Sequence, residues 1–174
     1  MKVIKTNFRG ILLIKNELHF DSRGYLKEIF SNNRIKFKNK FQYFSISKKN
    51  VFRGLHFQEP QQSKIVSVVK GEIYDYALDL RKNSKTFKKI FRIKLTEKEL
   101  STIVIPKGFA HGFLSLKNNT ILIYNNDNYR SKKEFGIHVN DPELKINLRP
   151  GVKISKKDKK NLYLKEFLNI YKTL

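Results

Sequence analysis

A histidine and a lysine stand on two consecutive apolar segments of the chain, and together they could move a proton. His56 lies in the stretch 51–58 and Lys64 in the stretch 61–69, which residue alternation predicts to be two strands joined by a short turn. In an antiparallel pair, opposing side chains are about 5 Å apart at Cβ, so the two groups would share one small cavity. Imidazole titrates near neutrality and can take a proton, while a buried ammonium can stabilise an oxyanion. The pair suits proton abstraction beside a carbonyl group, although a hydrogen-bonded barrel histidine and a solvated lysine fit this stretch equally well.

The elements that would position these residues are short strands with turn residues between them. Besides the two segments above, the predicted strands are 10–14, 18–20, 25–30, 41–47, 73–80, 88–95, 101–105, 113–116 and 120–124. About ten strands at close spacing, with no long amphipathic helix among them, predict an all-β antiparallel sandwich or barrel. The same pattern argues against a parallel α/β sheet.

Helical features are confined to two segments. Residues 31–40 could hold a helical turn, and the C-terminal segment 162–174 has apolar residues at helical spacing. These apolar residues are Tyr163, Phe167, Ile170, Tyr171 and Leu174. We expect this C-terminal segment to pack its apolar face on the barrel or on a partner subunit.

The composition sets the class of protein. With 174 residues, 40% of them hydrophobic, the chain can bury one sizeable core. We expect a single domain over residues 1–174 with a helical extension from about residue 160. The chain has no cysteine, so it has neither a disulfide framework nor a thiolate zinc site. The apolar run 11–14 near the N-terminus is too short for a signal peptide or a membrane span, so we expect a cytoplasmic protein with no membrane partner.

A formal net charge of +22 would suit a protein that binds nucleic acid. However, only eight of the 37 basic residues are arginine, and the lysines are spread along the whole chain. Proteins that read bases and phosphates rely on arginine forks and a localised patch. We therefore expect no nucleic-acid partner, although the charge would attract an anionic nucleotide diphosphate.

An ordered set of short motifs resembles the dTDP-4-dehydrorhamnose 3,5-epimerases over about residues 21–158. The motifs are Asp21-x-Arg23-Gly24, Glu28-x-Phe30, Arg53-Gly54-Leu55-His56-Phe57-Gln58, Lys64, Asp79-Leu80-Arg81, Ile105-Pro106-Lys107-Gly108-Phe109-Ala110-His111-Gly112-Phe113, Tyr124, Glu134-x-Gly136-Ile137 and Asn140-Asp141-Pro142. The resemblance implies a cupin-type jelly-roll barrel, a homodimer, and epimerisation of a nucleotide-linked 4-keto-6-deoxy sugar without a cofactor. It also implies a role in deoxysugar biosynthesis for surface polysaccharide.

The resemblance assigns a catalytic role to each of four residues. His56 matches the base, Asp158 the carboxylate that orients its imidazole, and Lys64 the cation that stabilises the enolate. Tyr124 matches the phenol that returns a proton on the opposite face. Epimerisation beside a ketone needs these groups. Without the resemblance, Tyr124 would be interpreted as a core tyrosine whose hydroxyl contacts water. Asp158 would be interpreted as a surface charge or a helix cap.

Other matched residues are predicted to bind the nucleotide sugar or to support the barrel. The predicted binders are Arg23, Glu28, Gln42, Arg53, His111 and Glu134. Arg23 and Arg53 could fork onto phosphate or sugar oxygens. Asp79 and Arg81 are expected to form a structural pair.

Two departures from the family pattern predict a divergent member. The family tends to have Gln-x-Asn-x-Ser where this chain has the run 42–47, which would replace an amide by Phe44. Val139 stands where an aromatic residue is usual. The nucleotide is therefore left open between dTDP and GDP, the sugar between a hexose and a heptose, and the inverted centre between C3, C5 or both.

Metal binding and two other functions are alternatives to this interpretation. Pro106-x-Gly108-x-x-His111 resembles a cupin metal motif, but the second motif is absent and His56-Phe57-Gln58 stands in its place. A metal site needs three or four converging ligands, so we expect neither a metal nor a cofactor. The alternatives are a 3,4-ketoisomerase, which moves the carbonyl group, and a non-catalytic basic β-barrel that binds a nucleotide sugar or nucleic acid.

Overall fold

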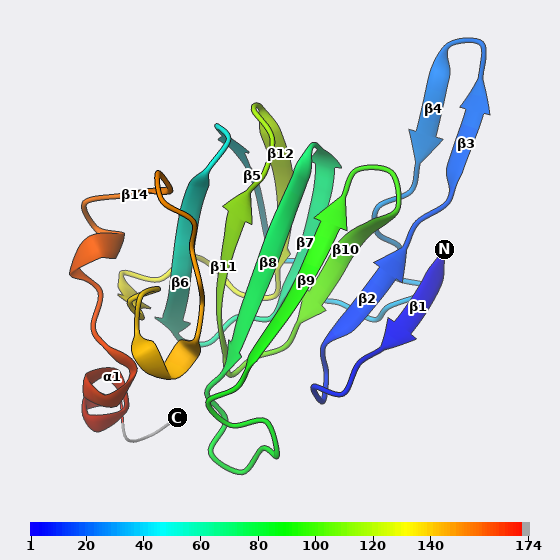
Figure 1. Cartoon of the computed structure of the whole chain (residues 1–174). Coiled ribbons are helices and arrows are strands. Elements are labelled where there is room, and N and C mark those ends of the chain that lie inside the picture. The colour runs from blue at the N-terminus through cyan, green and yellow to red at the C-terminus, as the bar shows by residue number, and fades with distance from the viewer. Residues whose placement is uncertain (172–174) are drawn as a thin grey trace.

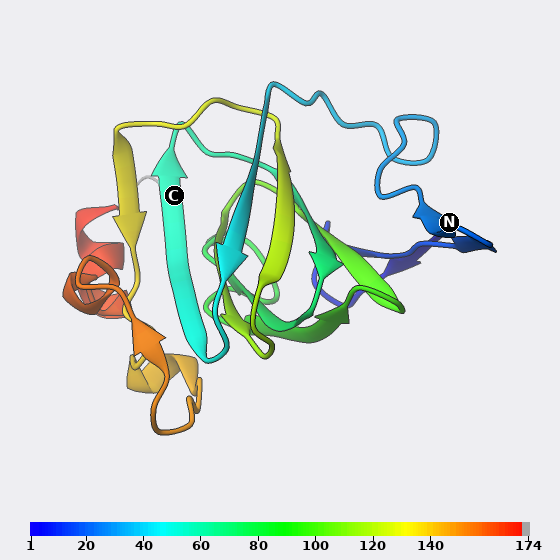
Figure 2. The ribbon, with the colours of Figure 1, turned by 90° about the horizontal axis from the view of Figure 1, so that it is seen from above.

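Two antiparallel sheets face each other in the computed structural model, which describes residues 1–171 (Figure 1, Figure 2). The first sheet has the spatial order β1 (Lys2–Lys5), β2 (Leu12–Lys15), β10 (Leu100–Ile105), β7 (Lys64–Lys70), β12 (Thr120–Asn126) and β5 (Phe41–Ser47). The second has the order β13 (Lys133–Gly136), β6 (Val51–Glu59), β11 (Phe109–Ser115), β8 (Glu72–Asp79) and β9 (Ile90–Thr96), with β14 (Lys153–Ile154) parallel to β6. The remaining elements are the hairpin of β3 (Leu18–Asp21) and β4 (Gly24–Lys27), two 3₁₀ turns, η1 (Pro142–Leu144) and η2 (Asp158–Lys160), and α1 (Leu164–Ile170). The predicted all-β jelly-roll barrel is confirmed.

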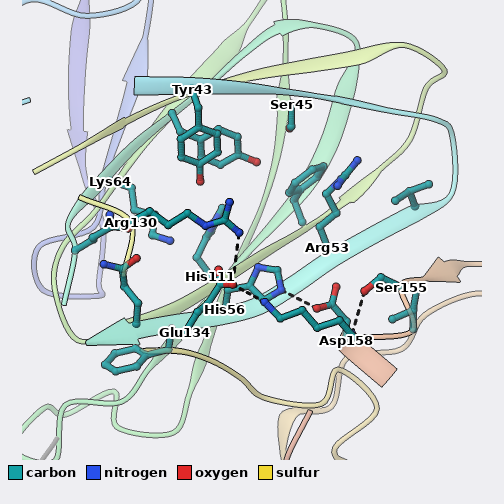
Figure 3. A pocket seen from close by; sticks show the side chains of 18 of the residues that line it. Tyr43, Ser45, Arg53, His56, Lys64, His111, Arg130, Glu134, Ser155 and Asp158 are labelled. Atoms are coloured by element: carbon teal, nitrogen blue, oxygen red, sulfur yellow. Dashed lines mark hydrogen bonds and ion pairs between the residues drawn. The ribbon is translucent and has the colours of Figure 1, made fainter. Parts of the chain in front are cut away.

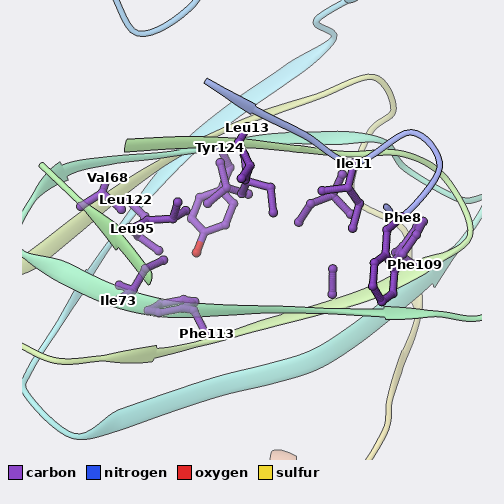
Figure 4. Close-up of a cluster of buried hydrophobic side chains, with 14 residues drawn as sticks. Phe8, Ile11, Leu13, Val68, Ile73, Leu95, Phe109, Phe113, Leu122 and Tyr124 are labelled. Atoms are coloured by element: carbon purple, nitrogen blue, oxygen red, sulfur yellow. The ribbon is translucent and has the colours of Figure 1, made fainter. Parts of the chain in front are cut away.

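Apolar side chains from both sheets fill one part of the space between them (Figure 4). Val66 and Val68 of β7 and Ile73 of β8 are fully buried there, because alternate residues of a strand point to the same face. Phe8 and Ile11, from the loop between β1 and β2, join the same cluster. Burial of a side chain of this size stabilises the fold by about 1.5–3 kcal/mol. This cluster therefore stabilises the packing of the two sheets. Polar residues line the remaining part of the space between them.

A second apolar cluster lies on the outer face of the β6 sheet, under the C-terminal segment. Leu164 and Phe167 of α1 are fully buried, and the centroid of the Phe167 ring lies 5.9 Å from that of Phe57. The predicted C-terminal helix therefore packs on the barrel. Leu174, the last residue of that helical pattern, lies outside the described residues.

Residues 31–40, for which a helical turn is predicted, form one hydrogen-bonded turn and no helix. The Ile35 N–H donates to the Ser31 carbonyl at 3.0 Å, but the Phe37 N–H donates to the Asn32 side chain at 3.1 Å. A side chain that takes a backbone donor in this way competes with continuation of a helix.

The prediction that the strands of His56 and Lys64 form a hairpin is wrong. β6 pairs with β11 and β13 in one sheet, and β7 pairs with β10 and β12 in the other. The segment between them bonds to a distant loop instead of closing a turn. The Ser63 N–H donates to the Asp127 carboxylate at 2.7 Å, and the Asp127 N–H donates back to the Ser63 carbonyl at 3.2 Å. His56 and Lys64 therefore stand on opposite walls of the space between the sheets.

β6 and β11 approach each other closely where each strand has a glycine. A Cβ on Gly54, whose φ is +132°, would lie 2.4 Å from the Cα of Gly112. Only glycine fits such a contact at this φ without strain. The register of the two strands shifts near this point, and His56 becomes the direct cross-strand partner of His111. Two histidines thus lie side by side on one wall.

Candidate active site

A cavity of about 680 Å³ opens between the sheets, next to the apolar core (Figure 3). Seven of the ten predicted site residues line it, namely His56, Lys64, Tyr124, Asp158, Arg53, His111 and Glu134. Gln42, Arg23 and Glu28 do not belong to its lining. Residues from distant parts of the chain meet here because the two sheets supply opposite walls.

His56 and Asp158 form a hydrogen-bonded pair in the cavity. The distance from His56 Nε2 to Asp158 Oδ1 is 2.7 Å, and the Asp158 backbone N–H donates to Ser155 Oγ at 3.0 Å. Burial by itself raises the pKa of Asp158, but the hydrogen bond and charge of His56 and the bond with Ser155 together lower it below its ordinary value. A carboxylate only accepts hydrogen bonds, so Nε2 carries the proton and Nδ1 keeps its lone pair. The hydrogen bond therefore orients the imidazole so that Nδ1 can accept a proton.

A second pair of the same kind lies beside the first. The distance from His111 Nε2 to Asp75 Oδ2 is 2.8 Å, and both side chains are buried. The other oxygen of Asp75, Oδ1, has no hydrogen-bond partner among residues 1–171. The sequence interpretation missed Asp75, although a lone carboxylate in the apolar run 73–78 is a signal for a functional site.

Lys64 projects from β7 on the wall opposite His56 (Figure 3). Burial lowers the pKa of its ammonium group, while the charges of Glu134 and Asp75 work in the opposite direction. Within the described part of the chain, no carboxylate lies within 4.0 Å of Lys64 Nζ. A buried ammonium without a close partner is suited to pair with a charge that develops on a substrate.

Tyr124 is on the same wall as Lys64 and stacks on a second tyrosine. Tyr43 of β5 is its direct cross-strand partner, and the two rings are 4.6 Å apart at their centroids and inclined by 11°. Burial raises the pKa of Tyr124, and it raises that of Tyr43 to about 12. Both phenols therefore remain protonated at neutral pH and can act as donors.

The register of β5 corrects the prediction for Gln42. Phe41, Tyr43 and Ser45 face the cavity, whereas Gln42 and Phe44 point to the other side, as the two-residue period of a strand requires. Gln42 donates to Asn125 Oδ1 at 2.8 Å. Gln42 is therefore not a cavity residue, and the change at Phe44 does not alter the cavity either. The aromatic residues of β5 that line the cavity are Phe41 and Tyr43.

Charged side chains surround the mouth of the cavity. Arg53 is held in place because its Nε donates to Ser47 Oγ at 3.0 Å. Glu134 pairs with Lys157 and, at 3.8 Å, with Arg130. Burial by itself raises the pKa of Glu134, but the bond from Lys157 and the charges of neighbouring cations lower it more. The sequence interpretation missed Lys157 and Arg130 as cavity residues.

The loop that carries Arg130 is fixed by two buried amides. Gln62 Nε2 donates to the Asn128 carbonyl at 2.6 Å, and Gln58 Nε2 donates to the Tyr129 carbonyl at 2.9 Å. Gln58 Oε1 also accepts from the Ser131 N–H at 3.4 Å. The guanidinium of Arg130 is therefore presented at the cavity from a well-anchored backbone.

Arg23 lies in the turn of the β3–β4 hairpin, which projects away from the barrel, and Glu28 follows directly after β4 (Figure 1). The exposed Arg23 side chain pairs with Asp21 of the same turn at 2.6 Å. The root of the hairpin is anchored to the barrel because Lys27 Nζ donates to the carbonyls of Val68 and Glu97, at 3.3 and 2.5 Å. Neither predicted binder reaches the cavity of its own chain.

The expected pair of Asp79 and Arg81 is confirmed, with Nη2 and Oδ2 2.8 Å apart. Burial by itself raises the pKa of Asp79, but hydrogen bonds from Arg81, Ser84 and Thr86 lower it to about 2. The pair lies outside the cavity and ties the end of β8 to the loop that follows.

Residues 1–171 contain neither a cluster of metal ligands nor a helix that could span a membrane. No group of three or more histidine, aspartate or glutamate side chains there could hold a metal ion. None of the helices described is long and apolar enough to cross a membrane.

Comparison with known proteins points to one chemistry. The sequence model of the dTDP-4-dehydrorhamnose 3,5-epimerase family matches residues 5–166. The chain is 39% identical to dTDP-4-dehydrorhamnose 3,5-epimerase of Methanothermobacter thermautotrophicus, over 84% of this chain and 83% of that protein. It is 34% identical to the Escherichia coli enzyme of the same name over 98% of both chains. It also superimposes, with a TM-score of 0.89, on the dTDP-6-deoxy-D-glucose-3,5-epimerase of Legionella pneumophila in complex with dTDP-4-keto-L-rhamnose, at 36% identity over 94% of this chain and 93% of that one.

Proposed function

The chain belongs to the dTDP-4-dehydrorhamnose 3,5-epimerase family, and from this premise we propose how its cavity works. The protein is an isomerase that epimerises a nucleotide-linked 4-keto-6-deoxy sugar in deoxysugar biosynthesis. One observation supports the residue assignment most: His56 comes from β6 and Tyr124 from β12, so a base and an acid lie on opposite walls of one cavity. Inversion of a carbon requires a proton to leave one face and return to the other.

We assign each step to one residue. His56 removes the proton from C3 or C5, next to the C4 ketone, and Asp158 stabilises the imidazolium that forms. Lys64 stabilises the enolate oxygen with its buried ammonium. Tyr124 then donates its phenolic proton to the opposite face of the carbon. The imidazolium of His56 releases its proton to water, and water returns a proton to the phenolate of Tyr124.

The proposed substrate is a nucleoside diphosphate sugar. Arg53, Arg130, Lys153 and Lys157 line the cavity around the reacting residues and give it a positive field for a diphosphate. The related Legionella enzyme holds a dTDP-linked 4-keto sugar. We therefore propose a dTDP-linked sugar as the substrate and keep the GDP-linked equivalent as a second arm of the test. We further propose that the enzyme works in the cytoplasm, where nucleotide sugars are made, and that its product enters surface polysaccharide.

The test is incubation with each 4-keto-6-deoxy sugar nucleotide in deuterated water, read by NMR. We expect deuterium at both C3 and C5 together with inverted product. Migration of the carbonyl to C3 would instead identify a 3,4-ketoisomerase. Nucleotide binding without exchange would identify a non-catalytic module.

We also propose that two copies of the chain form a homodimer by exchanging their hairpins. Arg23 and Glu28 match family positions for substrate binding, yet both lie outside the cavity of their own chain. The hairpin that carries Arg23 and ends just before Glu28 has exposed large apolar side chains, Phe20, Tyr25 and Leu26. Exposed apolar groups on a projecting element favour contact with another surface. A two-fold dimer would cover this face and bring Arg23 and Glu28 to the partner's cavity.

Mixed dimers test the exchange directly. Arg23→Ala and His56→Ala would each be impaired as pure proteins at substrate concentrations below KM. A mixed dimer would contain one complete site, made of His56 from one copy and Arg23 from the other. After the two variants are unfolded and refolded together, we expect recovery of about a quarter of wild-type activity, the share that random pairing gives a two-fold dimer. No recovery in a mixture that contains mixed dimers would exclude exchange.

A further inference from the structure

Tyr43 has no role in the mechanism above, yet it lies against the proposed acid. It faces Tyr124 directly across the ladder of β5 and β12. The centroids of the two rings are 4.6 Å apart and the ring planes are nearly parallel, at 11°. Aromatic partners on neighbouring strands stabilise each other's orientation. Tyr43 and Tyr124 therefore form a rigid unit on the cavity wall.

The surroundings of Tyr124 make its orientation depend on this stack. The His111 ring approaches it edge-on, with centroids 6.4 Å apart and planes at 69°, while Tyr43 covers a face of the ring. Tyr124 is 5% exposed, whereas Tyr43 is 40% exposed. Tyr43 thus shields one face of the buried Tyr124 ring and is the more exposed of the two.

We propose that Tyr43 is a positioning residue for Tyr124: its ring holds the phenol toward the substrate and keeps water from protonating the enolate first. The inference rests on the proposed role of Tyr124 as the acid. A proton delivered by Tyr124 inverts the carbon. A proton returned by His56, after exchange with solvent, restores the original configuration. Tyr43 therefore sets the number of inversions per exchange event, a ratio that a residue with a purely structural role would not change.

The test measures solvent deuterium incorporation and epimerised product in the same incubation. The variants are Tyr43→Ala, Tyr43→Phe and Tyr124→Phe, each compared with wild type. Phe44→Ala is the matched control, because Phe44 is the next residue on β5, is 65% exposed and points away from the cavity. Binding of dTDP by each variant checks that the cavity is still formed.

We expect the ratio of product to exchange to fall about tenfold in Tyr43→Ala, since misplacement of a reacting group by about 1 Å can cost 10²-fold. Tyr43→Phe keeps the stacked ring and should stay within about twofold of wild type, because a lone hydroxyl typically contributes little. Phe44→Ala should leave the ratio unchanged. If Tyr43→Ala does not bind dTDP, Tyr43→Leu replaces it, with the same expectation, because leucine keeps apolar bulk without a ring.

Several results would overturn the inference. A wild-type ratio in Tyr43→Ala or its leucine replacement would show that the stack does not position the acid. A loss in Tyr43→Phe as large as in Tyr43→Ala would make the Tyr43 hydroxyl, and not its ring, the active group. Tyr124→Phe separates the two proposals. A wild-type ratio in that variant refutes the acid itself, whereas a low ratio there with a normal ratio in Tyr43→Ala refutes only the positioning role.

Discussion

Two histidine–carboxylate pairs stand side by side on one wall of the cavity and differ in their burial. The nitrogen-to-oxygen distance is 2.7 Å for His56 with Asp158 and 2.8 Å for His111 with Asp75. The hydrogen bonds are therefore equivalent in length. The His56 side chain is 30% exposed, however, whereas that of His111 is only 5% exposed.

The two carboxylates also reach their histidines differently. Asp75 is on β8, the strand next to His111, and is fully buried within the sheet. Asp158 comes from η2, 102 residues away from His56 in sequence, and is held by Ser155. A group that exchanges protons with a substrate must have access to it, so the more open pair suits the base. The buried pair, His111 with Asp75, suits a structural role in the cavity wall. Two hydrogen bonds of nearly equal length can thus serve different roles because their burial differs.

Replacement of His56 should have the largest effect. In His56→Asn we expect deuterium exchange at C3 and C5 to fall by about 10²- to 10⁴-fold, as is typical when a general base is lost. NMR in deuterated water measures it. The matched control is His111→Asn, which should retain measurable exchange because it leaves His56 and Asp158 in place. Near-wild-type exchange in His56→Asn, or a larger loss in His111→Asn, would show that His56 is not the base.

Replacement of Asp158 should have the next largest effect. Asp158→Asn keeps the shape of the side chain, but its amide can donate to the imidazole and so favour the wrong tautomer. We expect turnover to fall on the order of 10²-fold with unchanged affinity for dTDP. Steady-state kinetics and calorimetry measure the two quantities. A weakened affinity with unchanged turnover would assign Asp158 to binding.

Replacement of Asp75 should have a smaller effect on turnover and should shift its pH dependence. Burial lowers the pKa of Lys64 below the ordinary 10.5, so its ammonium, and with it the stabilisation of the enolate, is lost as pH rises through that lowered value. The negative charge of Asp75 counteracts this shift. In Asp75→Asn we expect turnover at pH 7 to fall less than about tenfold and the alkaline limb of the pH–rate profile to move to lower pH. Lys64→Arg is the control, since a guanidinium stays charged and should remove the limb. If the alkaline limb persists in Lys64→Arg, the limb reports the deprotonation of a group other than Lys64.

The sequence predicted the more open pair, His56 with Asp158, and not the pair of His111 with Asp75, for a physical reason. His56 and Asp158 match positions of the family, and the order of the matched residues along the chain identifies both. Asp75 lies in an apolar strand, and the sequence analysis interpreted this segment only as part of the core. The predicted strands largely match the structure, because alternation records which face of each strand is buried.

The alternation of apolar and polar residues does not show which strands pair with each other. The hairpin predicted for His56 and Lys64 failed for that reason, since apolar strands of either sheet have the same pattern. β1, β13 and β14 were missed because they are only two to four residues long, too short for alternation to be recognised. Alternation also does not show which face of β5 meets the cavity, and Gln42 lies on the other face, because neighbouring residues of a strand point to opposite sides.

The smallest predicted effect concerns stability and applies only to the pair of His56 and Asp158. The pKa of Asp158 is lowered in the folded protein, so its pairing with His56 stabilises the fold at pH values above the unfolded-state pKa of about 3.8. This contribution is lost as pH falls through the still lower folded-state value. We expect Asp158→Asn to lower the free energy of unfolding by no more than about 1 kcal/mol at pH 7, because His56 remains partly solvated. The difference between variant and wild type should shrink toward zero as the pH falls below 3.8. Urea unfolding at a series of pH values measures it, and a difference that stays constant with pH would show that Asp158 stabilises the fold by packing and not by its charge.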